Sequence, residues 1–194
     1  SIIVIGTPTT EQKYARIAPT KDAALASRAV QIHPGELLQT MADDTLKAVV
    51  LDVRPEAEYN QFHIAGARNV PLAEIPSIIP ELQAQQALNT VFVLASNDEA
   101  AATAAWKTLS AESIPNVYIL EGGINQWIAT FGQGDDVIVQ MASPSGDDTL
   151  CWAFPAALGD RFEAADPDPH AWQLDFIPKI KLQIKRDKSG GGCG

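Results

Sequence analysis

The sequence has only two cysteines in 194 residues, Cys151 and Cys193. Two cysteines this far apart form neither a disulfide scaffold nor a zinc-ligand spacing. The three histidines, His33, His63 and His170, are scattered along the chain. We therefore expect no metal site and no bound cofactor.

Basic residues are also few. Lys and Arg total 14 against 24 Asp and Glu, which gives a net charge of −10. This balance argues against nucleic-acid binding, which depends on Lys and Arg contacts to phosphate. One basic cluster lies near the C-terminus, and we interpret it as a solvated strand edge protected by lysines. Its members are Lys179, Lys181, Lys185, Arg186 and Lys188.

No hydrophobic run is long enough to form a transmembrane span or a complete signal peptide. Residues 1–5 are mostly apolar and are followed by a Gly/Pro break at residues 6–10. One interpretation is a short first strand. The other is the end of a removed signal or membrane anchor, which predicts an extracytoplasmic (periplasmic) or membrane-associated protein. The first interpretation leaves a cytoplasmic location open.

Strand-like and helix-like segments alternate between residues 30 and 131, which predicts an α/β fold with a parallel sheet flanked by helices on both faces. Residues 7–29 resemble a linker that leads into a short helix at 21–28. The expected strands are 30–32, 48–53, 91–94 and 116–120, with a short one within 63–72. The expected helices are 36–41, 56–62, 74–86, 100–111 and 124–131.

The composition changes after Phe131. Residues 132–189 form an extension rich in proline and aromatic residues, with a strand-like stretch at 137–139 and a half-exposed strand expected at 177–185. We name residues 151–176 the strap, because they are expected to pack over the domain itself or over a partner. Residues 190–194 form a glycine-rich tail that carries Cys193.

The stretch 90–105 is the candidate site. A buried strand is followed by the polar loop 96–99 and then by an alanine-rich helix. Proteins of the α/β class bind ligands at such a place, where the strand ends and the helix N-terminus is partially positive. Asp98 and Glu99 suit the N-cap and the first turn of that helix.

Two motifs resemble the rhodanese-like domain, and the resemblance covers about residues 29 to 131, after an N-terminal segment of residues 1–28. The first is matched by Asp52, Val53, Arg54, Glu58, Tyr59, His63, Ile64, Gly66, Ala67, Asn69 and Pro71. The second is matched by Asn116, Val117, Tyr118, Leu120, Glu121, Gly122, Gly123, Ile124 and Trp127. The resemblance implies a sulfurtransferase-like fold.

In that family the strand-to-helix loop begins with a cysteine whose thiolate is stabilised by backbone N–H groups, and an arginine often closes the loop. The cysteine position falls at Ser96, or at Ala95 if the loop is one residue longer. The loop of this chain has neither cysteine nor arginine; it consists of Ser96, Asn97, Asp98, Glu99, Ala100 and Ala101. A serine hydroxyl cannot form a persulfide, and a nucleophilic Ser96 would need His63 as its base, a residue with a structural role in the family.

The family resemblance also implies a role for a second charged set. Asp52, Arg54 and Arg68 are expected to form a structural set that pairs across the sheet and orients the loops near the site.

These observations predict a catalytically inactive domain that acts as an accessory, scaffold or binding subunit with a protein partner. The alternative is a sulfur-relay or redox carrier that uses Cys193, because a cysteine after three glycines is an accessible thiol. Two other interpretations of Cys193 remain open: a disordered tail, and pairing with Cys151 or with a partner.

Overall fold

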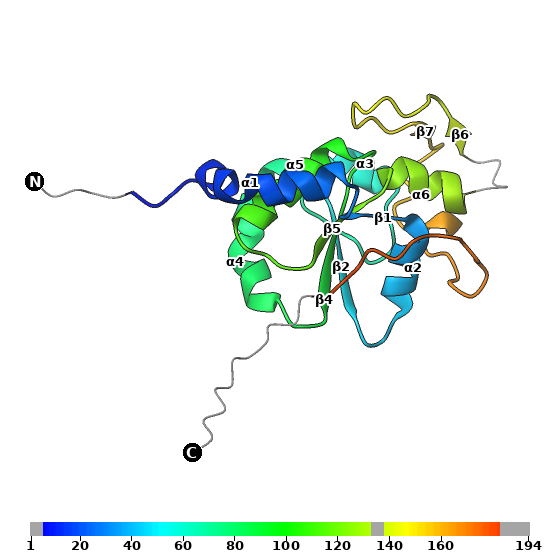
Figure 1. Cartoon of the computed structure of the whole chain (residues 1–194). Coiled ribbons are helices and arrows are strands. Elements are labelled where there is room, and N and C mark those ends of the chain that lie inside the picture. The colour runs from blue at the N-terminus through cyan, green and yellow to red at the C-terminus, as the bar shows by residue number, and fades with distance from the viewer. Residues whose placement is uncertain (1–5, 133–137, 183–194) are drawn as a thin grey trace, which may run out of the picture.

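The computed structural model describes residues 6–132 and 138–182, which form a five-stranded sheet covered by helices (Figure 1). All neighbouring strands are parallel, in the order β1-β5-β4-β2-β3. The bounds are β1 Gln31–Ile32, β2 Lys47–Asp52, β3 Arg68–Asn69, β4 Thr90–Ala95 and β5 Val117–Leu120. The predicted α/β class is confirmed. The strand expected at residues 1–5 and the tail with Cys193 lie outside the described residues.

The central strand β4 is buried along its whole length because both faces of the sheet are covered. Val91 and Val93 pack into one hydrophobic cluster, whereas Phe92 and Leu94 pack into the other. Side chains alternate between the two faces of a strand, so a continuous apolar run is the pattern expected for a strand buried on both sides.

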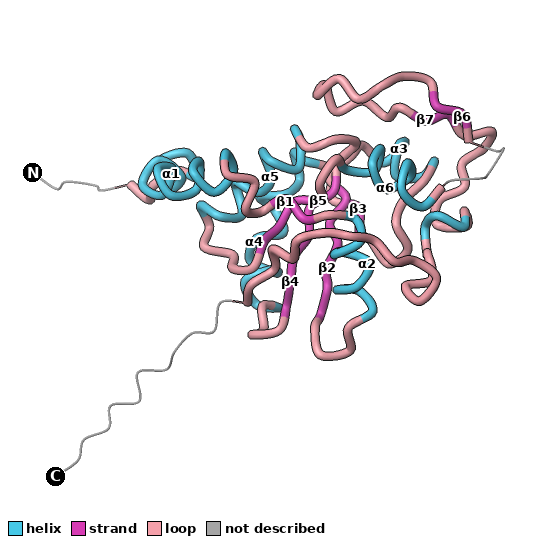
Figure 2. Tube along the Cα trace, turned by 45° about the vertical axis from the view of Figure 1, so that its right-hand side comes forward, coloured by secondary structure: helices cyan, strands magenta, loops and turns pink. Residues whose placement is uncertain are grey.

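The helices form two layers (Figures 1 and 2). The layer on one face contains α1, α4 and α5, and the layer on the other contains α2 and α6. The bounds are α1 Thr10–Ala26, α2 Pro34–Ala42, α3 Glu56–Gln61, α4 Ile75–Gln85, α5 Ala100–Ala111 and α6 Gly123–Phe131, with a 3₁₀ turn at Leu72–Glu74. None of the helices in the described part of the chain is long and apolar enough to cross a membrane.

The first helix corrects the expected linker. Helix α1 begins at Thr10 and continues through Pro19, where the sequence suggested only a short helix at 21–28. Thr9 and Gln12 form a capping box, which stabilises the N-terminus. The helix packs on α5, where Lys13 pairs with Glu112 at 2.7 Å. Tertiary packing therefore offsets the cost of an internal proline.

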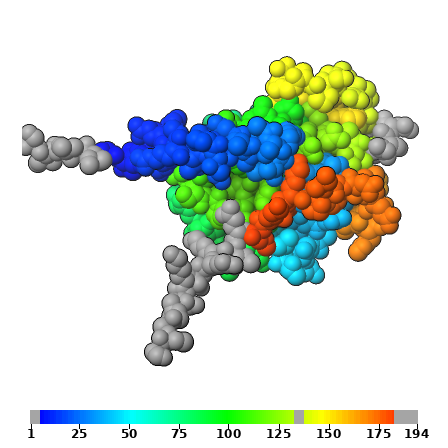
Figure 3. Space-filling model, in the orientation of Figure 1, coloured from blue at the N-terminus to red at the C-terminus, as the bar shows by residue number. Residues whose placement is uncertain are grey.

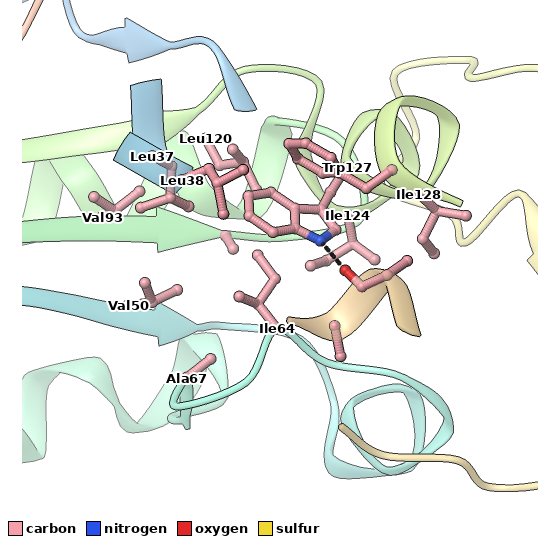
Figure 4. Packing of buried hydrophobic residues seen from close by; sticks show 14 of the residues in the cluster. Leu37, Leu38, Val50, Ile64, Ala67, Val93, Leu120, Ile124, Trp127 and Ile128 are labelled. Atoms are coloured by element: carbon pink, nitrogen blue, oxygen red, sulfur yellow. Dashed lines mark hydrogen bonds between the residues drawn. The ribbon is translucent and has the colours of Figure 1, made fainter. Parts of the chain in front are cut away.

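The strap packs on its own domain, over the face that α2 and α6 cover. Trp127 of α6 is fully buried, and its Nε1 donates to the Ala164 carbonyl at 2.7 Å (Figure 4). Ala164 lies in a second 3₁₀ turn, Glu163–Ala165. Ahead of it, β6 Val139–Gln140 pairs antiparallel with β7 Trp152–Ala153. The strap thus packs on the protein's own core, and its contact with a partner stays a prediction.

The strand expected at 177–185 is wrong over its described part, residues 177–182, which form no ladder. The backbone N–H groups there bond to side chains. Lys179 donates to both carboxylate oxygens of Glu36 at 2.8 and 2.9 Å, and Lys181 donates to the Tyr118 hydroxyl at 2.8 Å. The alternating apolar pattern thus marks an extended segment that covers part of the surface below α1 (Figure 3).

Candidate functional site

The loop that follows β4 lies at the carboxyl edge of the sheet. Strand β4 ends at Ala95, directly opposite Asp52 at the end of β2, and α5 begins at Ala100. The predicted strand, loop and helix are therefore all present.

Ser96, the first residue of the loop, is fully buried. Its hydroxyl donates to the Asp98 carbonyl at 3.2 Å and accepts from the Ala102 N–H at 3.2 Å. Both bonds lie within the loop and the start of α5, so the hydroxyl is a structural group that fixes the loop. It does not reach solvent.

His63, the only base considered for Ser96, is engaged elsewhere. Its ring stacks on Tyr59 with 3.7 Å between centroids, and its Nδ1 lies 2.8 Å from the Tyr59 carbonyl. Its backbone N–H donates to the Gly159 carbonyl of the strap at 3.0 Å. His63 thus positions the strap, and no hydrogen bond among the described residues joins it to Ser96.

The mouth of the loop is filled by Asp148, a residue that the sequence did not single out. Its Oδ1 accepts from the backbone N–H groups of Asn97 at 2.6 Å and Asp98 at 3.1 Å, and its Oδ2 accepts from the Ala101 N–H. In return the Asp148 N–H donates to Asp98 Oδ2 at 2.9 Å. We name the three donors, the backbone N–H groups of Asn97, Asp98 and Ala101, the N–H cradle.

Asp98 lies one residue before the N-cap of helix α5, which is Glu99, so the two acidic residues stand one position earlier than predicted. The Oδ1 atom of Asp98 accepts from the N–H groups of Glu99 at 2.6 Å and Ala100 at 3.1 Å. The Ala100 N–H belongs to the first turn, where intrahelical acceptors are missing. Asp98 therefore accepts hydrogen bonds from the start of α5 through Oδ1 and from the Asp148 N–H through Oδ2.

Glu99 points away from the cradle. Its carboxylate accepts from both terminal nitrogens of Arg28 at 2.6 and 2.9 Å, and from the Gly122 N–H at 2.8 Å. Burial opposes ionisation, but these donors together lower the pKa of Glu99 below its usual range. Glu99 thus connects the loop to the end of α1 and to the turn after β5.

Two of the three residues in the expected charged set form an ion pair. Arg54 Nη2 lies 2.7 Å from Asp52 Oδ2, and both side chains are almost completely buried. Arg54 also donates to the Phe62 carbonyl at 2.6 Å and to Asn97 Oδ1 at 3.4 Å. Arg68 does not join them, because it pairs with Glu81 at the surface.

Asn97 connects this buried pair to the N–H cradle. Its Nδ2 donates to Glu58 Oε2 at 2.7 Å and to the Asp148 carbonyl at 2.9 Å. The side chain therefore fixes the loop, α3 and the segment around Asp148 relative to one another.

Gly123 explains the paired glycines of the second motif. The turn after β5 passes so close to the loop that a Cβ on Gly123 would lie 2.2 Å from the Asp98 carbonyl oxygen and 2.4 Å from that of Ser96. Its φ of +60° lies in the left-handed region. The close approach lets the Ile124 N–H donate to the Ser96 carbonyl at 2.8 Å.

Cys151, the only cysteine in the described part of the chain, is the first residue of the strap and is buried. Burial, with the Asp98 carboxylate as the second cause, raises the pKa of its thiol. The described residues contain no group of His, Cys, Asp and Glu side chains that could hold a metal ion. The loop therefore has no thiol and no described metal ligands to carry chemistry.

Hollows on the surface of the described residues include one near the loop and one near α1. One of about 350 Å³ lies beside Asp148 and Ala101 and is lined by Arg54, Leu72 and Pro71 among others. A larger one, of about 670 Å³, lies between α1 and the segment 178–182, and Lys21, Lys179 and Lys181 contribute to its wall. Only the smaller hollow adjoins the candidate site.

Comparisons with known proteins agree with the fold. Centrosomal protein of 41 kDa B of Xenopus laevis is 33% identical over 91 residues, which are 44% of this chain and 25% of that protein. YqhL of Bacillus subtilis is 27% identical over 101 residues, which are 50% of this chain and 77% of that protein. The chain thus spans about a quarter of the length of its centrosomal relative.

Two solved structures are similar to this chain at low identity. A protein from Lactobacillus plantarum is 23% identical with a TM-score of 0.46, covering 58% of this chain and 93% of its own. A single-domain sulfurtransferase of Saccharomyces cerevisiae is 16% identical with a TM-score of 0.45, covering 54% of this chain and 93% of its own. The family described as Rhodanese-like domain matches residues 33–130, half of the chain, and the chain therefore belongs to the rhodanese-like domain family.

Proposed function

We propose that this protein is a rhodanese-like domain that does not transfer sulfur and acts as an accessory, scaffold or binding subunit of a larger assembly. The observation that carries the proposal is the loop itself. The family resemblance aligns the cysteine position with Ser96, or with Ala95 if the loop is one residue longer. Ser96 is buried, and a carboxylate fills the N–H cradle. A persulfide requires a thiolate, and the Asp148 carboxylate would repel an anionic sulfur donor.

A turnover assay tests the inactivity. Purified full-length protein is given thiosulfate as donor and cyanide as acceptor, and thiocyanate is measured. We expect background rates for the wild type. The variant Ser96→Cys tests whether the absence of a thiol is the only cause of inactivity, and Ser110→Cys, at a buried position near the C-terminal end of α5, is its control. Thiocyanate formation by the wild type well above background would disprove the inactivity.

The assembly role is tested separately. The full chain, tagged at its own locus, is isolated from its source cells and its native mass is measured. We expect a mass larger than that of the 20.8 kDa chain, with a protein present in fixed ratio. A free monomer under these conditions would contradict the accessory role. The membrane-associated or extracytoplasmic location stays a proposal, and fractionation of the same cells addresses it.

The alternative, a sulfur or redox carrier, depends on Cys193, which lies outside the described residues. One observation favours keeping it: the other cysteine, Cys151, is buried, so it is poorly placed for exchange with a partner. The variant Cys193→Ser is assayed for bound sulfane sulfur against the wild type. Absence of labile sulfur from both proteins would reject the carrier.

A further inference from the structure

The hollow of about 670 Å³ between α1 and the segment 178–182 carries charge of one sign on its wall. Figure 3 shows both sides of it, α1 in blue and the segment in orange-red, on one face of the molecule. Lys21 comes from α1, and Lys179 and Lys181 come from the segment, whereas no described Asp or Glu lines the hollow. We name this hollow the lysine groove. It is positively charged in a chain whose net charge is −10.

The charges of these lysines are not neutralised by the described residues. None of the three forms an ion pair there. The Lys21 ammonium lies 5.4 Å from the centroid of the Trp106 ring, and Lys179 Nζ donates to the Gln31 carbonyl at 2.8 Å. Both partners are neutral, so they position the ammonium groups and leave their charge in place. A cleft lined by one sign of charge concentrates small ions of the opposite sign.

Carboxylates in the neighbouring segments are already bound by other groups. Asp22 of α1 accepts from the Tyr14 hydroxyl at 2.7 Å, and Glu112 pairs with Lys13 at 2.7 Å. Glu36 is buried, and its carboxylate accepts from two backbone N–H groups of the segment 178–182. The described part of the chain therefore supplies no counter-charge to the lysine groove.

The floor of the lysine groove is apolar and reaches the interior of the domain. Trp106, Ile114 and Tyr118 contribute to it, and each of these side chains is more than nine-tenths buried. Small-molecule sites are concave, have volumes of a few hundred cubic ångströms, and combine a mostly apolar wall with a few polar groups that orient the ligand. A deep apolar floor beside cationic groups suits a ligand that has an apolar body and an acidic group.

We propose that the lysine groove binds a small organic anion that carries an apolar ring or a short hydrocarbon chain. Its acidic group pairs with the wall lysines, and its apolar part lies on the floor beside Trp106. The next residues of the chain do not complement the groove, because residues 183–188 contain three basic residues and one acidic residue. The inference follows from the lining of the groove, and it holds whether or not the protein is an accessory subunit.

Titration of the full-length protein with 2-naphthoate, followed by NMR, tests the proposal. The Trp106 indole N–H donates to the Val117 carbonyl at 2.9 Å, and both residues line the groove, whereas Trp127 belongs to the helix layer on the other face of the sheet. We expect saturable shifts of the Trp106 indole and the Ile114 amide, with a Kd on the order of 1 mM or lower, and no shift of the Trp127 indole. The neutral analogue 2-naphthamide should bind at least about fivefold more weakly because it lacks the charge.

The double variant Lys21→Gln/Lys181→Gln removes two of the wall charges. The segment stays attached, because the bonds of Lys181 to the Tyr118 hydroxyl are made by its backbone. This variant should raise the Kd of 2-naphthoate at least about fivefold. If the Trp127 indole resonance shows that the double variant does not fold, the two single variants replace it, each with a rise of at least about twofold.

The matched control is Lys47→Gln/Lys107→Gln. It also removes two charges, one of them over an aromatic ring, since Lys107 Nζ lies 5.6 Å from the centroid of the Tyr14 ring, and neither lysine lines the groove. This control should bind 2-naphthoate as the wild type does.

Equal affinity for 2-naphthoate and 2-naphthamide, equal losses in the two double variants, or a folded wild type without saturable shifts would overturn the proposal. It would also be overturned if the acidic peptide hexaglutamate bound more tightly than 2-naphthoate at the same resonances, because the groove would then be a protein-binding surface. None of these results depends on sulfur transfer or on the presence of a partner protein.

Discussion

At the scale of single residues, two arginines that look alike in the sequence differ in burial: one forms a buried ion pair and the other an exposed one. Arg54 is buried against Asp52, and its guanidinium also bonds to the Phe62 carbonyl at 2.6 Å. Arg68 pairs with Glu81, and both side chains are more than a third exposed. A buried pair that loses one partner leaves an uncompensated charge, whereas a surface pair is screened by solvent.

The variant Arg54→Met should therefore lower the free energy of unfolding by about 3–5 kcal/mol. The matched variant Arg68→Met removes an equivalent side chain and should leave stability nearly unchanged. Urea denaturation of both proteins measures the difference. Similar losses for the two variants would mean that the buried ion pair contributes no more than the surface pair.

The Cys151 thiol should be chemically inert in the native protein. The side chain is buried, and burial together with Asp98 raises its pKa, so little thiolate forms and reagents cannot reach it. When the native protein is titrated with a disulfide reagent, the number of thiols that react quickly should be the same for Cys151→Ser as for the wild type. A lower value for the variant would show that Cys151 is accessible, and would make its pairing with Cys193 feasible.

At the scale of elements, the loop after β4 is joined to α1 through Arg28 and Glu99. The pKa of Glu99 is lowered in the folded protein from an ordinary value of 4.5. A carboxyl group with a lowered folded pKa adds stability above its unfolded pKa and loses that contribution as the pH falls through the folded pKa. The contact between α1 and the loop should therefore contribute less to stability as the pH becomes acidic.

The variant Arg28→Ala tests this dependence. At neutral pH we expect a loss of at most about 1 kcal/mol, since the Arg28 side chain is 46% exposed and the ion pair is screened by solvent. The difference from the wild type should shrink as the pH falls below the ordinary value of 4.5 and through the lowered pKa of Glu99 in the folded protein. Denaturant midpoints across this range provide the measurement. A difference that is constant with pH would assign the effect to packing of Arg28.

At the scale of the whole molecule, the strap belongs to the core of the domain. Phe162 is buried edge-on against Phe62 with 6.1 Å between ring centroids, and Phe154 stacks on the same ring at 5.7 Å. Ile177, one residue beyond the strap, is 81% exposed. The strap thus buries aromatic area that the α2 and α6 face would otherwise expose.

Phe162→Ala should cost about 3–5 kcal/mol because it removes a buried ring and leaves a cavity. Ile177→Ala, a truncation at an exposed position, should stay within about 0.5 kcal/mol of the wild type. Thermal and urea unfolding compare the two variants. If Phe162→Ala were as stable as Ile177→Ala, the strap would be a detachable arm available to partners.

Patterns in the sequence predicted most of the sheet and the position of the loop, because they depend on local chain properties. The apolar run in β4 and the alanines of α5 specify a buried strand and a helix wherever they pack. The same reasoning failed for α1, where Pro19 suggested a break, and for residues 177–182, where alternation suggested a strand. In both cases contacts with distant residues, such as Glu112 and Glu36, decided the conformation.

The candidate site divides in the same way. The sequence by itself determined that the loop after β4 has no cysteine and no arginine, and that two acidic residues lie just before α5. Only the tertiary structure decided what fills the loop, because the N–H cradle consists of backbone groups that carry no sequence signature. The carboxylate that binds there comes from Asp148, which lies 50 residues from Asp98 along the chain, in a loop whose composition indicates only a turn.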